Sequence, residues 1–518
     1  MFNKLIFFLL LIYVPSVLAQ KLDAVRIEVP ADINVEQFHV EPIGDNGMLI
    51  FYESREVNKE EKRKWYFGLF DTNLKQVWLK FVPLYDKMEY ITSKKVKGNI
   101  YFLFKNINTE RFEYGYYEIV TYNYKNQFFS QISGSIPLKA EVAGFDVIDN
   151  TACIALNLKK YQTDLVFINI STGDVVPIHI NEGVEGYIEA LYANNASSTF
   201  FVAVKQNRDR RYIVDYLYSY SSNGEKLSEL KIDSKESIKY FRDYVFIHRS
   251  ANEFLIFGTY DILTGRTLSF KDITEEKEAE NAGMFFMNIV NGKQESLLFY
   301  DFMSFSNVIN SVQLNDISTV NFADSVRSNS NVQAVMASFS LTDPTVFKTE
   351  KDVYIFSADA YRPYYRTETR MDYDFYGRPY PYTYNVFSGY EFYDVIVAGI
   401  SPNGNLLWDN DFEINDVLTY STSRNSIIFE DDNYISMAYV NNGNIISQTI
   451  EGPVDIDRSK MKIGTNFPQD KVSQDENNKI VRWYSDYFLI YGYQKLKNRT
   501  LGEQSVRVVF YANKITYR

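Results

Sequence analysis

Tyrosine and arginine side chains are concentrated in residues 361–393, which hold ten tyrosines, three phenylalanines and four arginines. Tyrosine offers a rigid flat face and a hydroxyl, and arginine adds cation–π contacts and planar hydrogen bonding. The composition predicts a recognition surface for a protein, a peptide or a glycan. The alternative is that these tyrosines pack against neighbouring structure. The residues expected to make the binding contacts are Tyr361, Arg362, Tyr364, Tyr365, Arg366, Arg370, Tyr373, Tyr376, Arg378, Tyr380, Tyr382 and Tyr384.

Side chains that could catalyse a reaction are few. His179 and His248 alternate with apolar neighbours, as strand residues do, and neither lies at metal-ligand spacing from another histidine or cysteine. Cys153, the single cysteine, lies in the apolar run TACIALNL and is expected to be a small buried hydrophobe. No nucleophile elbow, zinc helix, phosphate-binding loop or dinucleotide fingerprint occurs. We therefore predict no catalytic residue, no metal and no cofactor.

Two groups of carboxylates remain to be explained. Asp409, Asp411 and Glu413 alternate along one expected strand face, and residues 430–432 precede another strand. Paired carboxylates hydrolyse glycosides when they are held about 5–9.5 Å apart, and oxygen clusters hold calcium. Neither group matches the calcium-loop pattern, so a solvated edge or turn is expected. Carboxylates from separate repeats could still converge, which keeps a hydrolase as an alternative.

The elements that must position these side chains repeat along the chain. A hairpin signature occurs at 220–227 (YSSNGEKL), 400–408 (ISPNGNLLW) and 440–446 (VNNGNII), with looser copies at 70–78, 170–176 and 290–296 and weaker ones at 124–129 and 511–517. Asn-Gly between apolar runs predicts a type I′ turn, which needs positive φ at both central residues. The repeat therefore indicates an all-β chain.

Apolar strands begin near residues 47, 98, 151, 199, 253, 352, 433 and 486. The first five are spaced by about 50 residues, a period typical of a β-propeller. We predict a propeller of seven or eight blades with a Tyr-rich loop insertion, and β-sandwich domains are the alternative. Ala24–Val29 is expected to close the ring beside Val506–Tyr511, because closure removes exposed sheet edges. Pro363, Pro379 and Pro381 argue against helix in the insertion.

The chain is expected to be exported. Lys4, the apolar run Leu5–Val14 and the small-residue site at 17–19 predict a signal peptide over residues 1–19. An N-terminal segment would follow at 20–46, and the propeller would occupy 47–518 with insertions near 271–331 and 361–393. No other segment is long and apolar enough to span a bilayer. The expected location is periplasmic, outer-surface or secreted.

Charge and aromatic content limit the partners. The formal net charge is −12, which argues against nucleic acid as a ligand. The chain has 42 Tyr and 39 Phe but only 4 Trp, and Tyr and Phe suit the pleated, half-buried surfaces of strands. A protein or glycan of the cell envelope is the expected partner.

Two resemblances support the propeller. FDTNLKQVW at 70–78 and ISPNGNLLW at 400–408 are loosely similar to pyrroloquinoline-quinone-type propeller repeats. The chain lacks the alanine- and glycine-rich strands of that family, so its cofactor is not carried over. Residues 361–416 resemble exported propeller-like proteins of unknown function from Bacteroidota-type bacteria, which implies a fold and no activity.

The sequence therefore predicts a non-enzymatic binding or scaffolding protein of the cell envelope that recognises a protein or glycan through a propeller face. The alternative is a hydrolase that acts on glycans through carboxylates in the central channel.

Overall fold

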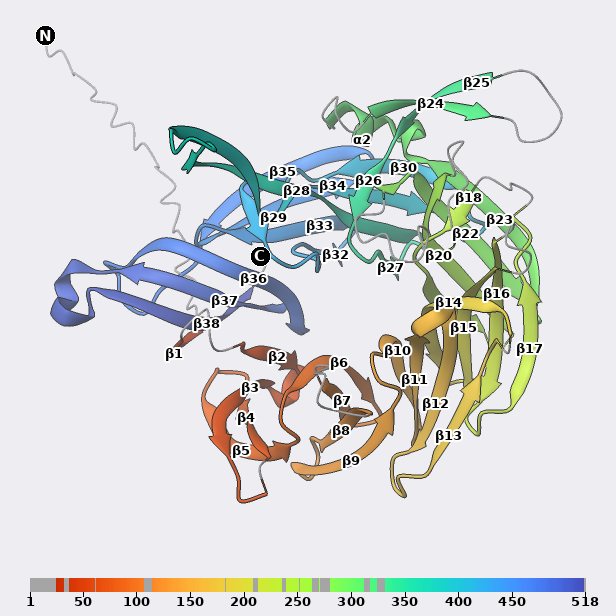
Figure 1. Ribbon diagram of the computed structural model, residues 1–518, viewed down its shortest axis with the longest axis horizontal. Coiled ribbons are helices and arrows are strands. Elements are labelled where there is room, and N and C mark those ends of the chain that lie inside the picture. The colour runs from red at the N-terminus through yellow and green to blue at the C-terminus, as the bar shows by residue number, and fades with distance from the viewer. Residues whose placement is uncertain are drawn as a thin grey trace, which may run out of the picture.

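The computed structural model describes residues 25–31, 37–60, 62–106, 114–181, 183–207, 213–234, 239–250, 252–262, 270, 280–311, 317–323 and 331–516. The predicted signal peptide lies outside these residues. The described chain is almost entirely β-strand, and its sheets follow one another around a ring (Figure 1). None of the helices in this part of the chain has the length and apolar content to cross a membrane.

Five sheets are four-stranded antiparallel meanders whose strands follow chain order. They are β2 (His39–Pro42), β3 (Met48–Val57), β4 (Arg63–Phe70) and β5 (Gln76–Leu84); β6 (Met88–Val96), β7 (Asn99–Asn106), β8 (Gly115–Asn123) and β9 (Phe128–Ile136); β10 (Glu141–Ile148), β11 (Thr151–Leu158), β12 (Gln162–Asn169) and β13 (Val175–His179); β14 (Glu185–Asn194), β15 (Thr199–Asn207), β16 (Ile213–Ser221) and β17 (Lys226–Lys231); and β32 (Ile427–Asp431), β33 (Tyr434–Asn441), β34 (Asn444–Glu451) and β35 (Val454–Lys462).

Two sheets are larger because their first strand is split and extra strands join them. One has β18 (Lys239–Phe241) and β19 (Val245–Ser250) on β20 (Glu253–Ile262), followed by β22 (Gly283–Val290) and β23 (Lys293–Asp301). The other has β26 (Phe339–Leu341) and β27 (Thr345–Lys348) on β28 (Tyr354–Tyr373), then β29 (Pro379–Ile400) and β30 (Leu406–Asp411), with β21 (Glu280–Asn281) and β31 (Val417–Thr419) at its edges.

The eighth sheet joins the two ends of the chain. Its strands are β36 (Lys471–Tyr484), β37 (Tyr487–Lys497), β38 (Val506–Thr516) and, at the outer edge, β1 (Val25–Pro30). β1 runs antiparallel to β38 with Val25 opposite Lys514 and Val29 opposite Phe510. The predicted ring-closing strand is therefore confirmed.

The core is divided among the interfaces between neighbouring sheets. Among the described residues, eight separate apolar clusters occur, one at each boundary around the ring. At the first boundary, the rings of Phe51 and Phe67 pack edge-on against Phe102 of the next sheet, with centroids 5.0 and 5.5 Å apart. Each sheet thus buries both faces, whereas a sandwich sheet packs only one face on its partner. The predicted β-propeller is confirmed.

The predicted turns are only partly correct. Asn291-Gly292 and Asn442-Gly443 both have positive φ at two successive residues, as a type I′ turn requires. The turns that end at Gly224 and Gly404 are one residue longer. Gly224 N–H donates to Ser221 and Gly404 N–H to Ser401, and a left-handed residue is needed only at the glycine. Of the weak copy at 511–517, residues 511–516 lie inside β38 and form no turn, and residue 517 lies outside the described chain.

The two predicted insertions have more regular structure than expected. Strands β22 and β23 of the fifth sheet lie within 271–331, together with the helices η3 (Phe302–Ser304) and α2 (Ser306–Ser311). A separate ribbon pairs β24 (Ile317–Ala323) with β25 (Asn331–Ala337). Residues 271–279, 312–316 and 324–330 lie outside the described chain. The remaining short 3₁₀ helices are η1 (Gly44–Asn46), η2 (Lys159–Tyr161) and η5 (Arg499–Gln504).

The Tyr-rich segment is a β-hairpin and not the predicted loop. β28 and β29 continue out of their sheet and stay paired to Tyr373 and Pro379, so the hairpin extends beyond the ring (Figure 1). From Tyr361 and Tyr390 outward to the tip, no other strand of the described chain pairs with the ribbon on either side. Proline is tolerated at such an edge because it removes only an outward-facing N–H, which explains why Pro379 and Pro381 do not interrupt β29.

We expect the closing sheet to depend on Arg26, whose side chain is only 2% exposed. Its guanidinium pairs with Glu28 at 2.8 Å, donates to Asn513 and Gln494 at 2.9 Å, and lies 4.5 Å from the Tyr511 ring centroid. Replacing Arg26 by Met removes these bonds and should lower the free energy of unfolding by about 3 kcal/mol, as for other broken buried ion pairs. Urea denaturation measures this loss.

The matched control is Arg55→Met, since Arg55 is exposed on β3. Equal stability losses for the two variants would contradict the role given to Arg26 in closing the ring.

Candidate functional site

The outer part of the β28–β29 hairpin presents two different faces. Cross-strand pairing places Glu368 opposite Tyr384, Arg370 opposite Tyr382 and Asp372 opposite Tyr380. The Arg370 guanidinium lies 5.5 Å from the ring centroids of both Tyr382 and Tyr384. Tyr384 donates its hydroxyl proton to Glu368 at 3.2 Å. This face is therefore a layer of tyrosine rings covered by arginine and tied together by hydrogen bonds.

The opposite face is apolar at its base and carries threonines farther out. Tyr365 and Phe387 are cross-strand partners with ring centroids 5.8 Å apart. Phe387 also contacts Tyr390 at 5.1 Å and Tyr420 at 6.5 Å. Tyr420 follows β31, which pairs with β29 at Tyr390–Phe392. The base of the hairpin thus forms an exposed aromatic surface beside the body of the propeller.

The tip of the hairpin is a tight, hydrogen-bonded turn. The Asp374 carboxylate accepts hydrogen bonds from the backbone N–H groups of Tyr376 and Arg378 at 2.9 and 2.8 Å. Gly377, with φ of 74°, closes the turn by donating its N–H to Asp374. Phe375 lies within this turn and is 97% exposed. Tyr373, Tyr376 and Met371 are exposed around it.

The sequence-predicted contact residues fall into two groups. Tyr361 is 6% exposed and packs against Tyr390 and Phe392 in the core, so it supports the hairpin from below. Arg362 is half-buried there and pairs with Glu391 at 2.8 Å. The others lie on the protruding ribbon: Tyr364, Tyr365, Arg366, Arg370, Tyr373, Tyr376, Arg378, Tyr380, Tyr382 and Tyr384. Except for the partly buried Tyr384, these residues are exposed to solvent and do not pack against a neighbouring blade.

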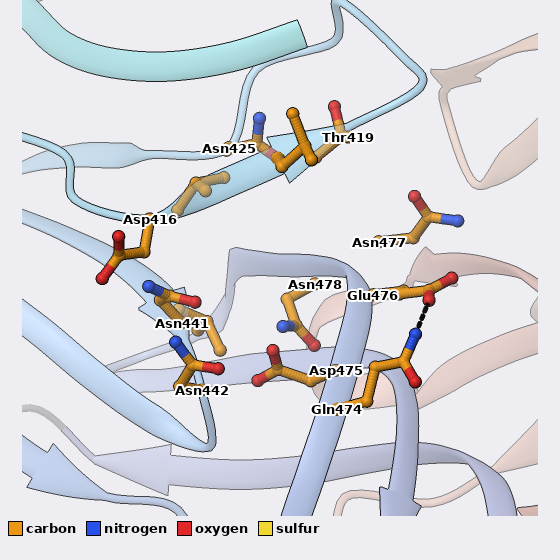
Figure 2. A pocket seen from close by; sticks show the side chains of 13 residues that line it. Asp416, Thr419, Asn425, Asn441, Asn442, Gln474, Asp475, Glu476, Asn477 and Asn478 are labelled. Carbon is orange, nitrogen blue, oxygen red and sulfur yellow. Dashed lines mark hydrogen bonds between the residues drawn. The ribbon is translucent and has the colours of Figure 1, made fainter. Parts of the chain in front are cut away.

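A polar pocket of about 220 Å³ lies beside the base of the hairpin (Figure 2). Its walls come from three successive sheets: β31 with the loop before it, the β33–β34 turn, and β36. The lining residues are mostly amides and carboxylates: Asp416, Val417, Leu418, Thr419, Asn425, Val440, Asn441, Asn442, Gln474, Asp475, Glu476, Asn477 and Asn478. Because β31 is hydrogen-bonded to β29, one wall of the pocket is continuous with the hairpin.

Local backbone irregularities produce the pocket. The pairing of β36 with β37 shifts register between Glu476 and Lys479, which pushes Asn477 and Asn478 out of the ladder. Asp416, Asn442 and Asn477 all have left-handed backbones, with φ of 57°, 49° and 51°. Asn and Asp adopt this conformation more readily than other non-glycine residues. Sequence reasoning missed the pocket, because Asx-rich turns are ordinary and nothing in the sequence shows that these three meet.

Several pocket side chains are held firmly by the protein. Asp475 accepts the Gly443 N–H at 2.7 Å, and Asn478 accepts the Tyr511 hydroxyl at 2.8 Å. Glu476 accepts from the Gln474 amide, as the dashed line in Figure 2 shows. These bonds fix the orientation of the walls before any ligand arrives.

Two carboxylates near the first strands of their blades pair with lysines of a neighbouring blade. β10 contacts β6 and β14, and these first strands lie toward the centre (Figure 1). Glu41 pairs with Lys95 at 2.7 Å and Asp146 with Lys94 at 3.5 Å, each across a blade boundary. Such ion pairs join blades, so they give no specific support to a hydrolase. Within the described ranges, no three histidine, cysteine, aspartate or glutamate side chains are placed together to hold a metal ion.

The other candidate groups have structural environments. Asp409, expected on a solvated edge, is instead buried, and its carboxylate accepts the backbone N–H groups of Asn307 and Val308 at 2.7 and 3.2 Å. Burial lowers the pKa of His39 to about 4 and raises the pKa of the Cys153 thiol. His179 pairs with Asp164 at 2.6 Å, and His248 contacts Asn194 at 3.1 Å.

Comparison with known proteins identifies no relative by sequence. No protein-family model matches the chain, and no curated protein matches it. Solved structures with a similar arrangement include the β-propeller domain of the Trilobed protease from Pyrococcus furiosus, with 7% identity, a TM-score of 0.34 and coverage of 84% of this chain and 96% of that one. The polysaccharide lyase Uly1 has 8% identity, a TM-score of 0.36 and coverage of 82% and 89%. Prolyl oligopeptidase B from Galerina marginata has 8% identity, a TM-score of 0.36 and coverage of 90% and 56%.

At such low identities and TM-scores these structures carry no activity over to this chain. The propeller assignment rests on the order and packing of its own sheets. The resemblance to Bacteroidota-type and quinoprotein-like proteins stays a prediction.

A buried carboxyl should make stability depend on pH. Glu118 on β8 is fully buried and accepts the Tyr85 N–H at 2.7 Å, and burial raises its pKa to about 7. The folded state therefore prefers the protonated form, so stability is greatest below about pH 4.5 and falls as the pH rises to about 7. In the Glu118→Gln variant, the free energy of unfolding should fall by roughly 3 kcal/mol less over this pH range than in the unmodified protein. Urea denaturation at pH 5 and pH 8 measures the difference.

Glu225→Gln serves as the control, because Glu225 is exposed in a turn. A Glu118→Gln variant whose stability falls as much as that of the unmodified protein over this range would show that Glu118 is ionised in the folded state.

Proposed function

We propose that the protein is an exported, non-enzymatic binding or scaffolding protein of the cell envelope, and that it recognises a protein partner through the outer part of the β28–β29 hairpin. The observation that carries this proposal is the exposed aromatic tip, in which Phe375 is 97% exposed within the hydrogen-bonded turn between the two strands. Large exposed apolar groups gathered in one place mark interaction sites more often than isolated ones do.

The residue types at the tip favour a protein partner. Aromatic residues, methionine and arginine are enriched at the cores of protein interfaces, and Tyr and Arg are frequent hot spots. Met371, Tyr373, Phe375 and Tyr376 supply the apolar part, and Arg378 lies 5.8 Å from the Tyr376 ring centroid. A rigid ribbon also orders few side chains on binding, which lowers the entropic cost of association.

The tyrosine layer on the ribbon is less suited to a glycan. A sugar ring would need a free aromatic face on which to pack, but Arg370 lies over both Tyr382 and Tyr384. The exposed faces that remain are at the tip and at the base. We therefore assign the tip to a protein partner.

Shortening the hairpin tests the proposal without disturbing the ring. Arg366 lies opposite Val386, so residues 367–385 can be replaced by Asn-Gly, a two-residue type I′ turn. The shortened protein should unfold at the same temperature as the full chain and should lose the partner, because the ribbon makes no part of the blade core. Pull-down from an envelope extract, with the partner identified by mass spectrometry, measures the loss.

A photo-crosslinking amino acid at position 375 identifies the contact directly. It should give one defined adduct, whereas the same amino acid at the exposed Phe128 on outer strand β9 should give none. The proposal fails if position 375 yields no adduct, if position 128 yields the same one, or if the shortened protein still retains the partner.

A further inference from the structure

We infer that the pocket formed by β31, the β33–β34 turn and β36 binds one neutral sugar residue of a glycan. This site is separate from the hairpin tip, and the inference does not depend on the tip binding a protein. It starts from a cavity that residues of three blades line together (Figure 2).

The pocket contains polar groups that the protein does not use. The side chains of Asp416, Asn442 and Asn477 make no hydrogen bond to any other residue in the described part of the chain. Each comes from a different sheet, and each is positioned by a left-handed backbone. Three blades therefore each contribute an exposed polar side chain, free of hydrogen bonds to other described residues, to the lining of the pocket.

Asn425 supplies an independent observation. Its side chain is 5% exposed and lines the pocket, and its amide Nδ2 has no hydrogen-bond partner among the described residues. The Lys479 ammonium donates to its Oδ1 at 3.2 Å, which defines the orientation of the amide. A buried donor without a partner costs about 1–3 kcal/mol. Asn425 therefore contributes a buried polar side chain to the wall of the pocket.

The chemistry of the lining matches hydroxyl groups. A sugar hydroxyl both donates and accepts, and Asn and Gln amides offer both functions on one planar group, while carboxylates accept. Six amide side chains and three carboxylates line this cavity, with Thr419 among them. A volume of about 220 Å³ is below the roughly 300–1,000 Å³ of drug-sized sites. One sugar ring, and not a longer chain, is the occupant that fits.

The charge of the lining and the neighbouring surface restrict the chemical class of the ligand further. Lysine, arginine and histidine do not occur among the described residues that line the pocket, whereas Asp416, Asp475 and Glu476 do. A uronic acid or a phosphorylated sugar would be repelled by these carboxylates. Outside the pocket, the aromatic surface of Phe387, Tyr390 and Tyr420 adjoins the β31 wall, and its exposed ring faces can take the apolar face of the next sugar in a glycan.

The experiment measures binding of methyl glycosides to the full chain by saturation-transfer NMR and titration. The probes are the methyl glycosides of glucose, galactose, mannose and N-acetylglucosamine, with methyl glucuronide and Ca²⁺ alone as comparisons. At least one neutral glycoside should bind, and methyl glucuronide should bind at least tenfold more weakly.

Matched glycine variants locate the site. Asn442→Gly removes an amide from the pocket while keeping the left-handed backbone that glycine adopts freely, and it should weaken binding about tenfold, the equivalent of one or two lost hydrogen bonds. Asn291→Gly makes the same change in the same type of turn far from the pocket and should leave binding unchanged. Asn477→Gly should behave like Asn442→Gly.

Three results would overturn the inference: no neutral glycoside binds, binding is equally affected by Asn291→Gly and Asn442→Gly, or the pocket variants alter only the binding of Ca²⁺. Thermal unfolding of every variant is measured alongside, so that a loss of fold is not taken for a loss of binding. The hairpin-shortened protein should still bind the glycoside, which separates this inference from the proposed protein partner.

Discussion

Closure of the ring is the constraint on which the rest of this structure depends. Every sheet is covered on both faces by its neighbours, and the apolar clusters lie between blades and not within them. An open ring would expose the last cluster, where Met48 and Ile50 meet Leu489 and Phe510. The pairing of β1 with β38 prevents this by making the outermost strand of the final sheet from the N-terminal part of the chain.

The same constraint explains where recognition features can lie. Residues between blades are committed to packing, and central carboxylates such as Glu41 and Asp146 are committed to ion pairs across blade boundaries. A segment that leaves its sheet is free of both roles and can carry a partner surface. The β28–β29 hairpin does so by extending two strands that already belong to a blade, which gives its tip a rigid support.

The hairpin and the polar pocket are neighbours because one short strand serves both. β31 pairs with the base of β29 on one side and forms a wall of the pocket on the other. The two features differ in chemistry: the tip is aromatic and protrudes, whereas the pocket is lined by amides and carboxylates and is concave. The proposed protein-binding tip and the proposed sugar-binding pocket are therefore connected through one blade.

The sequence by itself determined the class of fold, because apolar strands, Asn-Gly turns and a period of about 50 residues are local patterns that survive in any tertiary arrangement. It also located the Tyr/Arg segment and the closing strand. It did not show that the segment is a hairpin, since two edges must be free for Pro379 and Pro381 to remain in a strand. Only the tertiary structure buried Tyr361, and only it brought Asp416, Asn442 and Asn477 together, because contacts between blades follow from ring geometry and not from spacing along the chain.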